Sequence, residues 1–310
     1  MKKRILAVSS ANMDLVLNVN RVPSAGETVI DSKKYTYIPG GKGANAAVTI
    51  ARLDGDSVFC TRLGNDNNGT ALKNFYKENG IDTRFIKKDA NAPTGLAAIF
   101  VESNGMNRII VYPGANAKIN KEDVEEAFMC YPDALFVNFE IPYESVVCAC
   151  SYARKQGIPI IVDAGPADTS LNLDLLGEIE VFSPNESETL AFTGIAPTNA
   201  DNCLRAAIAL YKKVKAKYIV IKLGDRGCYI YDGIHYHICT AYEVNAVDTT
   251  AAGDAFTAAM TLEYVRSGDI VGACKYANAV GALVVSKEGA SSSIPTYKEV
   301  FEFIKEREII

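Results

Sequence analysis

The chain has 310 residues, of which 48% are hydrophobic and 22% are charged, and its net charge is −5 with a pI near 5.3. This composition is typical of a globular protein with one large core. The scattered lysines and arginines exclude an electrostatic footprint for nucleic acid or an anionic membrane. The apolar run at residues 5–8 is too short for a signal peptide, and no stretch approaches the roughly 20 apolar residues of a membrane span. We therefore expect a cytoplasmic protein that acts on small molecules, with no nucleic-acid and no membrane partner.

Apolar segments of strand length alternate with segments of helical period along most of the chain. The expected strands are residues 4–9, 58–62, 135–137, 160–163, 181–183 and 218–223, and the expected helices are residues 44–53, 70–79, 143–156, 201–215, 253–267 and 270–287. Strands that alternate with helices predict a parallel sheet that is covered by helices on both faces. The sequence therefore predicts an α/β fold of three layers, α/β/α, with a mainly parallel central sheet.

Four further strand-like segments have no helix between them: residues 14–20, 28–38, 96–101 and 108–112. The last two flank Ser103-Asn104-Gly105, and Asn-Gly is a strong hairpin signal because it accepts the positive φ of a tight turn. We infer a small antiparallel β lid of residues 13–38 and 95–113, beside a main domain of residues 1–12, 39–94 and 114–310. The edge strands of such a lid can pair with a second copy, so we also expect a homodimer through the lid.

The segment at residues 248–256 reads Asp-Thr-Thr-Ala-Ala-Gly-Asp-Ala-Phe and leads into a helix of small residues. Small residues before a helix let backbone N–H groups approach a ligand, and the helix dipole favours an anion there. The pattern therefore predicts that the amides of Ala252 and Gly253 bind a phosphate, and we call this pair the amide cradle. Asp254, beside it, could accept a proton from an attacking hydroxyl. On these residues alone an alternative stays open, in which a polar residue caps the helix and Asp254 only favours its dipole.

A glycine-rich turn, Pro39-Gly40-Gly41-Lys42-Gly43, lies between an expected lid strand and an expected helix. Its glycines allow a tight turn with accessible amides, and Lys42 and Asn45 offer polar groups to a polyhydroxylated ligand. It is not a Walker A loop, because no glycine stands five positions before Gly41 and Lys42 is followed by Gly43 rather than Ser or Thr. Alone, the segment is also consistent with an ordinary strand-to-helix turn.

Together the two segments resemble the signatures of the ribokinase, or PfkB, family of carbohydrate kinases, and the resemblance covers nearly the whole chain. Residues 248–261 fit the family's C-terminal signature at every position, and residues 40–64 fit the N-terminal one except at Asp54, where glycine is usual. That position is expected to end a helix, where aspartate tolerates left-handed geometry better than most residues. The resemblance implies transfer of the γ-phosphate of ATP to a sugar hydroxymethyl group, with Asp254 as general base. Lys42-Gly43 in the glycine loop favours the 5-hydroxyl of ribose.

Two other functions are consistent with the same resemblance. A kinase for fructose, deoxyribose or a nucleoside would share the chemistry, whereas a non-catalytic sugar-sensing protein would share only the fold. The intact Gly253-Asp254 pair argues against the sensing protein. A nicotinamide-dependent dehydrogenase is rejected, because the first strand is followed by Ser9-Ser10-Ala11-Asn12 rather than by G-x-G-x-x-G.

On the sugar side, the resemblance assigns hydroxyl-binding roles to residues after the first strand, in the glycine loop and after the strand at residues 135–137. These residues are Asn12, Asp14, Gly40, Gly41, Lys42, Asn45 and Glu140, together with Asp254. Plainer alternatives stay open, because Asn12 and Asp14 could be turn residues and Glu140 could cap the following helix.

On the nucleotide side, the resemblance assigns Asn185 and Glu188 of an N-x-x-E pattern to the Mg²⁺ and phosphate region. Mg²⁺ prefers oxygen ligands and keeps several waters, so one carboxylate that acts partly through water is adequate. The loop beside the nucleotide matches Lys222, Gly224, Asp225, Arg226 and Gly227, the phosphate side includes Gly253, and the adenine side matches Asn278. The alternatives are a helix cap at Asn185, a plain hairpin after Lys222 and a solvent-facing Asn278.

The resemblance also implies a site for K⁺ as an activator. The matching positions are Asp248, Thr250, Val284, Lys287, Gly289 and Ser293. Most of these ligands would be backbone carbonyls, which are indifferent to side-chain identity. The sequence itself therefore supports little of this site beyond Asp248 and Ser293.

Overall fold

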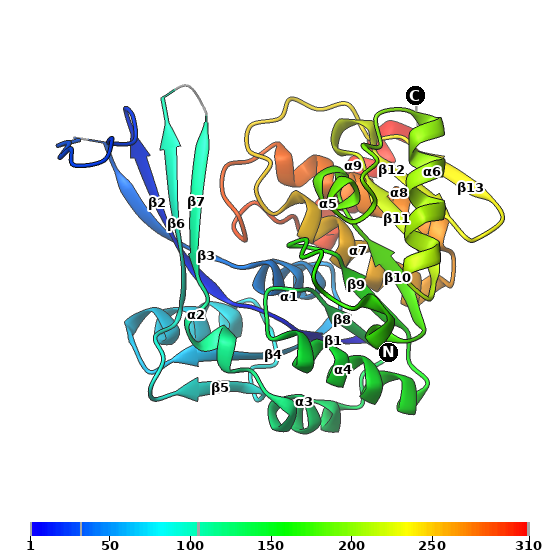
Figure 1. Ribbon diagram of the computed structural model, residues 1–310, viewed down its shortest axis with the longest axis horizontal. Helices are drawn as coiled ribbons and strands as arrows, with labels where there is room; N and C mark the ends of the chain where they lie inside the picture. The colour runs from blue at the N-terminus through cyan, green and yellow to red at the C-terminus, as the bar shows by residue number, and fades with distance from the viewer. Residues whose placement is uncertain (1, 32, 104–105, 309–310) are drawn as a thin grey trace.

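The computed structural model describes residues 2–31, 33–103 and 106–308. Within this range it contains a nine-stranded sheet with the order β13-β12-β11-β10-β9-β8-β1-β4-β5 (Figure 1). The strands are β1 (Arg4–Val8), β4 (Asp56–Gly64), β5 (Ile86–Asp89), β8 (Ala134–Val137), β9 (Ile160–Asp163), β10 (Ile179–Ser183), β11 (Ala216–Lys222), β12 (Cys228–Tyr231) and β13 (Tyr236–Cys239). All neighbours from β11 to β5 are parallel, whereas β12 and β13 form an antiparallel edge.

Helices cover both faces of this sheet and bury two separate apolar clusters. Successive residues of β1 point to opposite faces, so Ile5 and Ala7 belong to one cluster and Leu6 and Val8 to the other. The first cluster packs under α1 (Lys42–Arg52), α2 (Asn67–Glu78), α7 (Ala252–Ser267), α8 (Ile270–Val285) and α9 (Tyr297–Glu308), and the second under α3 (Lys121–Ala127), α4 (Tyr143–Gln156), α5 (Glu186–Thr193) and α6 (Ala200–Lys213). The expected three-layer α/β/α fold with a mainly parallel sheet is confirmed.

The order of the large sheet reverses beside β1. After β1 the chain builds β4 and β5 on one side, and later adds β8, β9, β10 and β11 on the other side. Ligands of open α/β sheets bind outside the carboxyl ends of the strands at such a switch point. The residues that follow β1 and β8 are therefore placed at the edge where a ligand is expected.

A smaller sheet of four strands projects from one side of the layered body (Figure 1). Its order is β3 (Tyr35–Gly40), β2 (Asn12–Val19), β6 (Gly95–Glu102) and β7 (Asn107–Tyr112). The outer pairs are antiparallel, as expected for this sheet, and the central pair of β2 and β6 is parallel. Asn104 and Gly105 of the expected hairpin turn lie outside the described residues.

The expected strand at residues 28–38 is wrong in its first half, because β3 begins only at Tyr35. In the β2–β3 register Asn12 faces Gly40 and Leu17 faces Tyr35, so β2 has ended before residues 28–31 could pair with it. Ser32 lies outside the described residues. Alternation of side chains alone does not reveal where the partner strand ends.

Local backbone geometry agrees with the sequence at Asp54. This residue follows the end of α1 and has a φ of 63°, which is the left-handed geometry expected where glycine is usual. The 8 cysteines are free thiols, seven of them buried and Cys148 partly buried. None of the helices in the described residues is long and apolar enough to cross a bilayer.

Candidate active site

Asp254 lies at the amino end of α7, where two side chains from α1 meet it. It is the third residue of the helix and only 7% exposed. The Nζ of Lys42 donates to its Oδ1 at 3.2 Å, and the Nδ2 of Asn45 donates to its Oδ2 at 2.9 Å. The first turns of α1 and α7 therefore converge on one carboxylate, although they are about 210 residues apart in the chain.

The start of α7 is not capped by a side chain. Its N-cap is Ala251, which has a left-handed φ of 63° and no side-chain capping bond. The alternative in which a polar residue of this segment only caps the helix is therefore not observed. The amide of Ala252 donates to the Thr249 carbonyl at 3.3 Å, and the helix itself provides no acceptor for the amide of Gly253.

Glu140 follows β8 and turns toward the glycine loop rather than toward α4. Its Oε2 accepts hydrogen bonds from the Ser10 hydroxyl and from the Lys42 amide, the latter at 3.2 Å. The N-cap of α4 is Pro142, without a side-chain bond, so the capping alternative for Glu140 is not observed. Burial is the largest cause that raises the pKa of Glu140, with Asp254 adding to it, while Lys42 and Ser10 act in the opposite direction.

Asp14 is a strand residue of β2 rather than a turn residue, and it is buried. Burial, followed by repulsion from Glu140 and Asp254, raises the pKa of Asp14 to about 7. Among the described residues its Oδ1 has no hydrogen-bond partner. A Cβ on Gly40 would lie 2.0 Å from the Asp14 Oδ2, so only glycine leaves room for this carboxylate. A buried oxygen without a donor is the kind of group that a ligand hydroxyl can satisfy.

Asn12 is held at the start of β2 by a residue that the sequence did not indicate. Its Oδ1 accepts from the Asn116 Nδ2 at 2.8 Å, and the Asn116 Oδ1 accepts from the Ala11 amide at 2.9 Å. Gly41 has a φ of 92°, and a Cβ there would lie 2.8 Å from the Asn12 nitrogen. Another unpredicted residue, Ser291, donates to the Oδ1 of Asn45 at 2.7 Å. The only sequence signal at Ser10, Asn116 and Ser291 is a single polar side chain, which is too common to identify a site.

On the expected nucleotide side, Asn185 and Glu188 form a reciprocal capping box at the start of α5. The side chain of each accepts from the backbone amide of the other at 2.8 Å, so the capping alternative for Asn185 is observed. Burial raises the pKa of Glu188, against the charges of Lys222 and Lys42. Its Oε1 lies against Gly165, where a Cβ would be only 2.3 Å away.

The described residues contain no cluster of three or more His, Cys, Asp or Glu side chains that could hold a metal ion. A divalent cation near Glu188 would therefore take most of its ligands from phosphate and water, which is the usual pattern for Mg²⁺. The single carboxylate fits that role, because its Oε1 takes no part in the capping box.

The expected nucleotide loop follows β11 and is indeed a hairpin. Lys222 ends the strand, a short turn spans Gly224–Arg226, and the chain returns as β12, with Asp225 exposed in the turn. A Cβ on Gly227 would lie 2.0 Å from the Cys239 carbonyl oxygen. Arg226 bonds to the Glu186 carboxylate and to the Pro197 carbonyl, which ties the turn to the start of α5.

Asn278 is buried in α8, so the solvent-facing alternative is not observed. Its Nδ2 donates to the carbonyl oxygens of Cys239 at 3.1 Å and Thr240 at 3.0 Å. The residue thereby fixes the chain where it leaves β13, on the same side of the molecule as the hairpin loop.

The residues of the expected K⁺ site come from two loops that contact each other. Asp248 accepts from the Thr250 amide and hydroxyl at 2.9 and 2.6 Å, and from the Gly289 amide at 3.0 Å. Burial would raise the pKa of Asp248, but these hydrogen bonds override it and hold the pKa below its ordinary value. The remaining positions lie at or after the end of α8. The Lys287 amide donates to the Val284 carbonyl at 3.2 Å, and the Lys287 Nζ pairs with Glu299 at 2.8 Å. The Ser293 hydroxyl donates to the Ala290 carbonyl at 2.8 Å.

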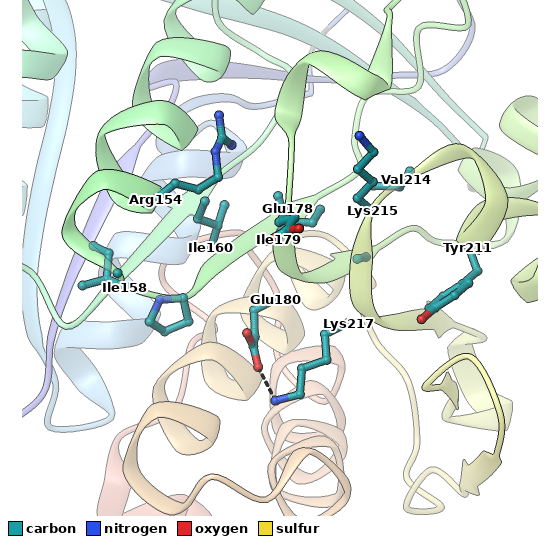
Figure 2. Close-up of a pocket in the computed structure, with 13 residues that line it drawn as sticks. Arg154, Ile158, Ile160, Glu178, Ile179, Glu180, Tyr211, Val214, Lys215 and Lys217 are labelled. Atoms are coloured by element: carbon teal, nitrogen blue, oxygen red, sulfur yellow. Dashed lines mark hydrogen bonds and ion pairs between the residues drawn. The ribbon is translucent and has the colours of Figure 1, made fainter.

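A cavity of about 650 Å³ lies at the amino ends of the parallel strands, opposite to the end at which Asp254 lies (Figure 2). It is lined by the residues that precede or begin β9, β10 and β11, among them Ile160, Ile179 and Lys217. None of the expected site residues lines it. The candidate active site instead lies at the carboxyl ends of the same strands, where Asp163 and Lys222 are found.

Comparison with known proteins places this geometry in a family. Residues 2–297 match the model of the pfkB family carbohydrate kinases. The chain is 35% identical over 303 residues to a ribokinase of Staphylococcus aureus, covering 97% of this chain and 99% of the relative. It is 31% identical over 303 residues to a deoxyribokinase of Salmonella typhi, covering 96% of this chain and 98% of the relative. The structure of Arabidopsis thaliana ribokinase complexed with ribose and ATP superposes with a TM-score of 0.90 at 31% identity, over 98% of this chain and 99% of that one. The chain belongs to the pfkB family of carbohydrate kinases.

Proposed function

We propose that the protein transfers the γ-phosphate of ATP to the 5-hydroxyl of D-ribose. One observation carries the proposal: the first turns of α1 and α7 meet at Asp254, a buried carboxylate bonded to Lys42 and Asn45. The ribokinase of S. aureus and the A. thaliana complex with ribose and ATP support both substrates. Because one relative is a deoxyribokinase, 2-deoxyribose is a second candidate substrate, and it would be phosphorylated by the same chemistry.

In the proposed reaction Asp254 accepts the proton of the primary hydroxyl as that oxygen attacks the γ-phosphorus in line. The amides of Ala252 and Gly253 and the dipole of α7 stabilise the charge on the transferred group. The 3.3 Å bond of the Ala252 amide to Thr249 is at the long end of the hydrogen-bond range, so a phosphate oxygen replaces it at little cost. ADP leaves as the phosphate ester forms.

Sugar hydroxyls are the proposed donors to the buried acids around Asp254. The Oδ1 of Asp14 has no partner among the described residues, Glu140 lies beside the Lys42 amide, and a pentose offers several O–H groups at once. Asn12, Gly40, Gly41 and Asn45 shape the same pocket. Unpaired acceptors in a dry site discriminate strongly against a substrate that lacks the matching hydroxyl.

The nucleotide is proposed to lie along the β11–β12 loop, with Lys222, Gly224, Asp225, Arg226 and Gly227 beside it and Asn278 on the adenine side. Glu188 and Asn185 would hold Mg²⁺ through water. The metal supplies positive charge to the β- and γ-phosphates. Lys42 remains an ammonium there, because Asp254 above all, then Asp163, Glu140 and Glu188, raise its pKa against the opposing effect of burial.

The small sheet, residues 13–38 and 95–113, is proposed to act as a lid that closes over the sugar at the main domain of residues 1–12, 39–94 and 114–310. Closure would exclude water, which otherwise competes with the sugar as phosphate acceptor. We propose that the outer face of this lid also joins two copies into a homodimer. Its exposed apolar side chains include Tyr35, Tyr37, Ile110 and Tyr112.

We also propose that K⁺ activates the enzyme from the loops at Asp248, Thr250, Val284, Lys287, Gly289 and Ser293. Asp248 lies six residues before Asp254 and fixes the loop that leads into α7. A cation between these loops would stiffen the amide cradle without touching a substrate. A rate that stays the same when tetramethylammonium replaces K⁺ would reject this part of the proposal.

One assay tests the activity directly. ADP release is measured with Mg-ATP against ribose, 2-deoxyribose, fructose and adenosine, each with and without K⁺. The proposal expects the highest kcat/KM with ribose and an increase with K⁺. A higher kcat/KM with 2-deoxyribose would assign the second candidate, and no sugar-dependent ADP release would overturn the kinase function.

A further inference from the structure

The proposed place of Lys222 beside the nucleotide does not by itself explain the buried ion pair through which this residue joins the sheet to α7. The Nζ of Lys222 donates to the Oδ2 of Asp163 at 2.6 Å and to the Oγ1 of Thr257 at 3.1 Å. The Thr257 hydroxyl itself donates to the same carboxylate oxygen at 2.6 Å. Asp163 is 1% exposed, Thr257 is fully buried and Lys222 is 8% exposed. Each of the three side chains comes from a different element: β9, β11 and α7.

Stability alone does not account for a pair of this kind. Removing a lysine and an aspartate from water costs several kcal/mol per ion, and well-packed apolar residues often serve as well or better in such positions. A buried pair beside a binding crevice is more readily explained by what its charge does there. Asp163 is enclosed, so the lysine is the member that can reach a ligand.

The ammonium of Lys222 is placed at the amide cradle. A Cβ built on Gly253 would lie 3.8 Å from the Lys222 Nζ, and Gly253 immediately precedes Asp254. Within the described residues the Nζ donates to Asp163 and Thr257, which uses two of its three N–H donors. The third donor remains for an acceptor on the ligand.

The anchor of this lysine is a carboxylate in its ionised form. Burial would raise the pKa of Asp163, but the charges of Lys222 and Lys42 and the hydrogen bonds from Lys222 and Thr257 override it and lower the pKa. Lys42 is shared with Asp254 and lies toward the expected sugar. Each lysine is therefore hydrogen-bonded to its own aspartate, Lys42 to Asp254 and Lys222 to Asp163.

Resting on the proposed kinase function, we propose that Lys222 is a second fixed cation for the transferred phosphoryl group. Asp163 and Thr257 are its positioning residues. The ammonium donates to an oxygen of the γ-phosphate and balances its charge from the nucleotide side, while Lys42 does so from the sugar side. The bond that forms and the bond that breaks are those of the kinase reaction itself, so no further reactant is needed.

The test compares Lys222→Met, Asp163→Asn and the double variant. The double variant removes both charges and so leaves no unpaired ion in the interior, which keeps the test possible if the single variants fold poorly. Turnover of ribose is expected to fall about 100-fold in Lys222→Met, the usual effect of losing one such donor. Asp163→Asn is expected to lower kcat less, and the double variant is expected to match Lys222→Met because both act through one charge.

Binding of nucleotides without sugar gives a readout that a purely structural role would not change. Wild-type protein is expected to bind a non-hydrolysable ATP analogue more tightly than ADP, and Lys222→Met to lose about tenfold of that preference. Calorimetry of both nucleotides measures it. The inference is overturned if the folded Lys222→Met or double variant keeps both kcat and this preference within about threefold of wild type.

The matched control lies on the same strand. Lys217 is the second residue of β11, at the other end of the strand, and its Nζ lies 2.8 Å from Glu180 (Figure 2). The same Nζ lies 3.3 Å from the hydroxyl of Tyr264 in the last turns of α7. Lys217→Gln is expected to keep kcat and the nucleotide preference. If wild-type protein and Lys222→Met are equally active, this inference alone is overturned. If wild-type protein shows neither sugar-dependent turnover nor binding of the ATP analogue, the proposed function is overturned together with it.

Discussion

At the scale of single residues, the proposed chemistry depends on how Asp254 is held. Lys42 and Asn45 each bond one of its oxygens, so the carboxylate has a fixed orientation before any substrate arrives. Fixed orientation is what a general base needs, because proton transfer requires hydrogen-bond distance to the attacking hydroxyl.

Asp254→Asn keeps the shape of this side chain and removes its basicity. We expect kcat for ribose to fall by roughly 10² to 10⁴ and the thermal stability to fall as well, because Lys42 keeps its charge without the partner carboxylate. Steady-state ADP release and a melting curve measure the two effects. Asp201→Asn is the control, because Asp201 also lies in the first turn of a helix, α6, but is exposed. Near-normal turnover of Asp254→Asn would remove this residue from the mechanism.

Asp14 predicts how stability depends on pH. Its pKa is raised to about 7 in the folded protein, so the folded state holds the proton more tightly than the unfolded state does. Between pH of about 4 and about 7 the unfolded carboxyl is ionised while the folded one is protonated, and its contribution to stability therefore falls as the pH rises. The asparagine of Asp14→Asn does not titrate and avoids this loss.

The expected result for Asp14→Asn is a gain in unfolding free energy over wild type that is larger at pH 8 than at pH 5. Urea denaturation at both pH values measures this gain. The same variant is expected to bind ribose more weakly at pH 8, where the wild-type carboxylate is ionised and is a stronger acceptor for sugar hydroxyls than an amide. A stability difference that does not change with pH would contradict the raised pKa.

The sequence predicted the residues of the two glycine-rich segments and missed their distant partners. Lys42, Asn45 and Asp254 could be proposed as site residues, because glycines at close spacing mark a backbone that approaches a ligand, and the structure brings these three side chains into contact. Ser10 and Asn116 could not, because their contacts to Glu140 and Asn12 span 130 and 104 residues of chain. Such a contact exists only once the sheet order is known.

At the scale of elements, local pattern predicted the interior strands of the large sheet from β4 to β11 and six helices, but it missed α3, α5 and α9. The expected helix at residues 143–156 and the expected strand at residues 160–163 agree with α4 and β9 residue for residue. β5 was missed, since its four residues, Ile-Lys-Lys-Asp, form an edge strand with a largely polar pattern. Edge strands carry lysines because these discourage pairing with other chains, which also hides them from hydrophobic patterns.

The junction between β3 and α1 gives a prediction at this scale. A methyl group in Gly40→Ala would lie 2.0 to 2.6 Å from three atoms of the Asp14 carboxyl group, so β2 or β3 must shift. We expect a KM for ribose that is raised about tenfold or more, because the lid strand and a sugar acceptor move together. Steady-state kinetics measure the change.

Gly281→Ala is the matched control for Gly40→Ala. Gly281 lies inside α8, and nothing stands within 4 Å of the Cβ that it would gain. Alanine there is expected to raise the unfolding free energy by about 0.5–1 kcal/mol and to leave the KM unchanged. If Gly40→Ala behaved in the same way, the close approach of Gly40 to Asp14 would have no part in sugar binding.

At the scale of the whole molecule, the sheet order brings the site together. β1 and β8 are neighbours although about 130 residues separate them, and this pairing sets Glu140 beside the loop at Ser10. Alternating strands and helices predict a parallel sheet but not its order, because any right-handed arrangement of the same units satisfies the pattern. The family resemblance, rather than hydrophobic periodicity, therefore carried the prediction that these segments meet.

The outer face of the small sheet predicts the state of assembly. Asp14, Ala97 and Val111 pair across the strands and share the face toward the active site, so the next row, which includes Tyr37 and Ile110, lies on the opposite face. Tyr37 is 55% exposed and Ile110 51% exposed, and an apolar sheet face of this kind is suited to a second copy.

Ile110→Glu places a charge at the β7 end of that row and is expected to convert a dimer into monomers, because an unpaired carboxylate would be buried in the interface. Light scattering coupled to gel filtration measures the mass, and the folded monomer is expected to lose part of its sugar affinity if the partner supports the lid. Ile234→Glu is the control, since Ile234 is 82% exposed in the loop between β12 and β13, away from the small sheet. Wild-type protein that elutes as a monomer, or an Ile110→Glu variant that stays dimeric, would show that this face does not join two copies.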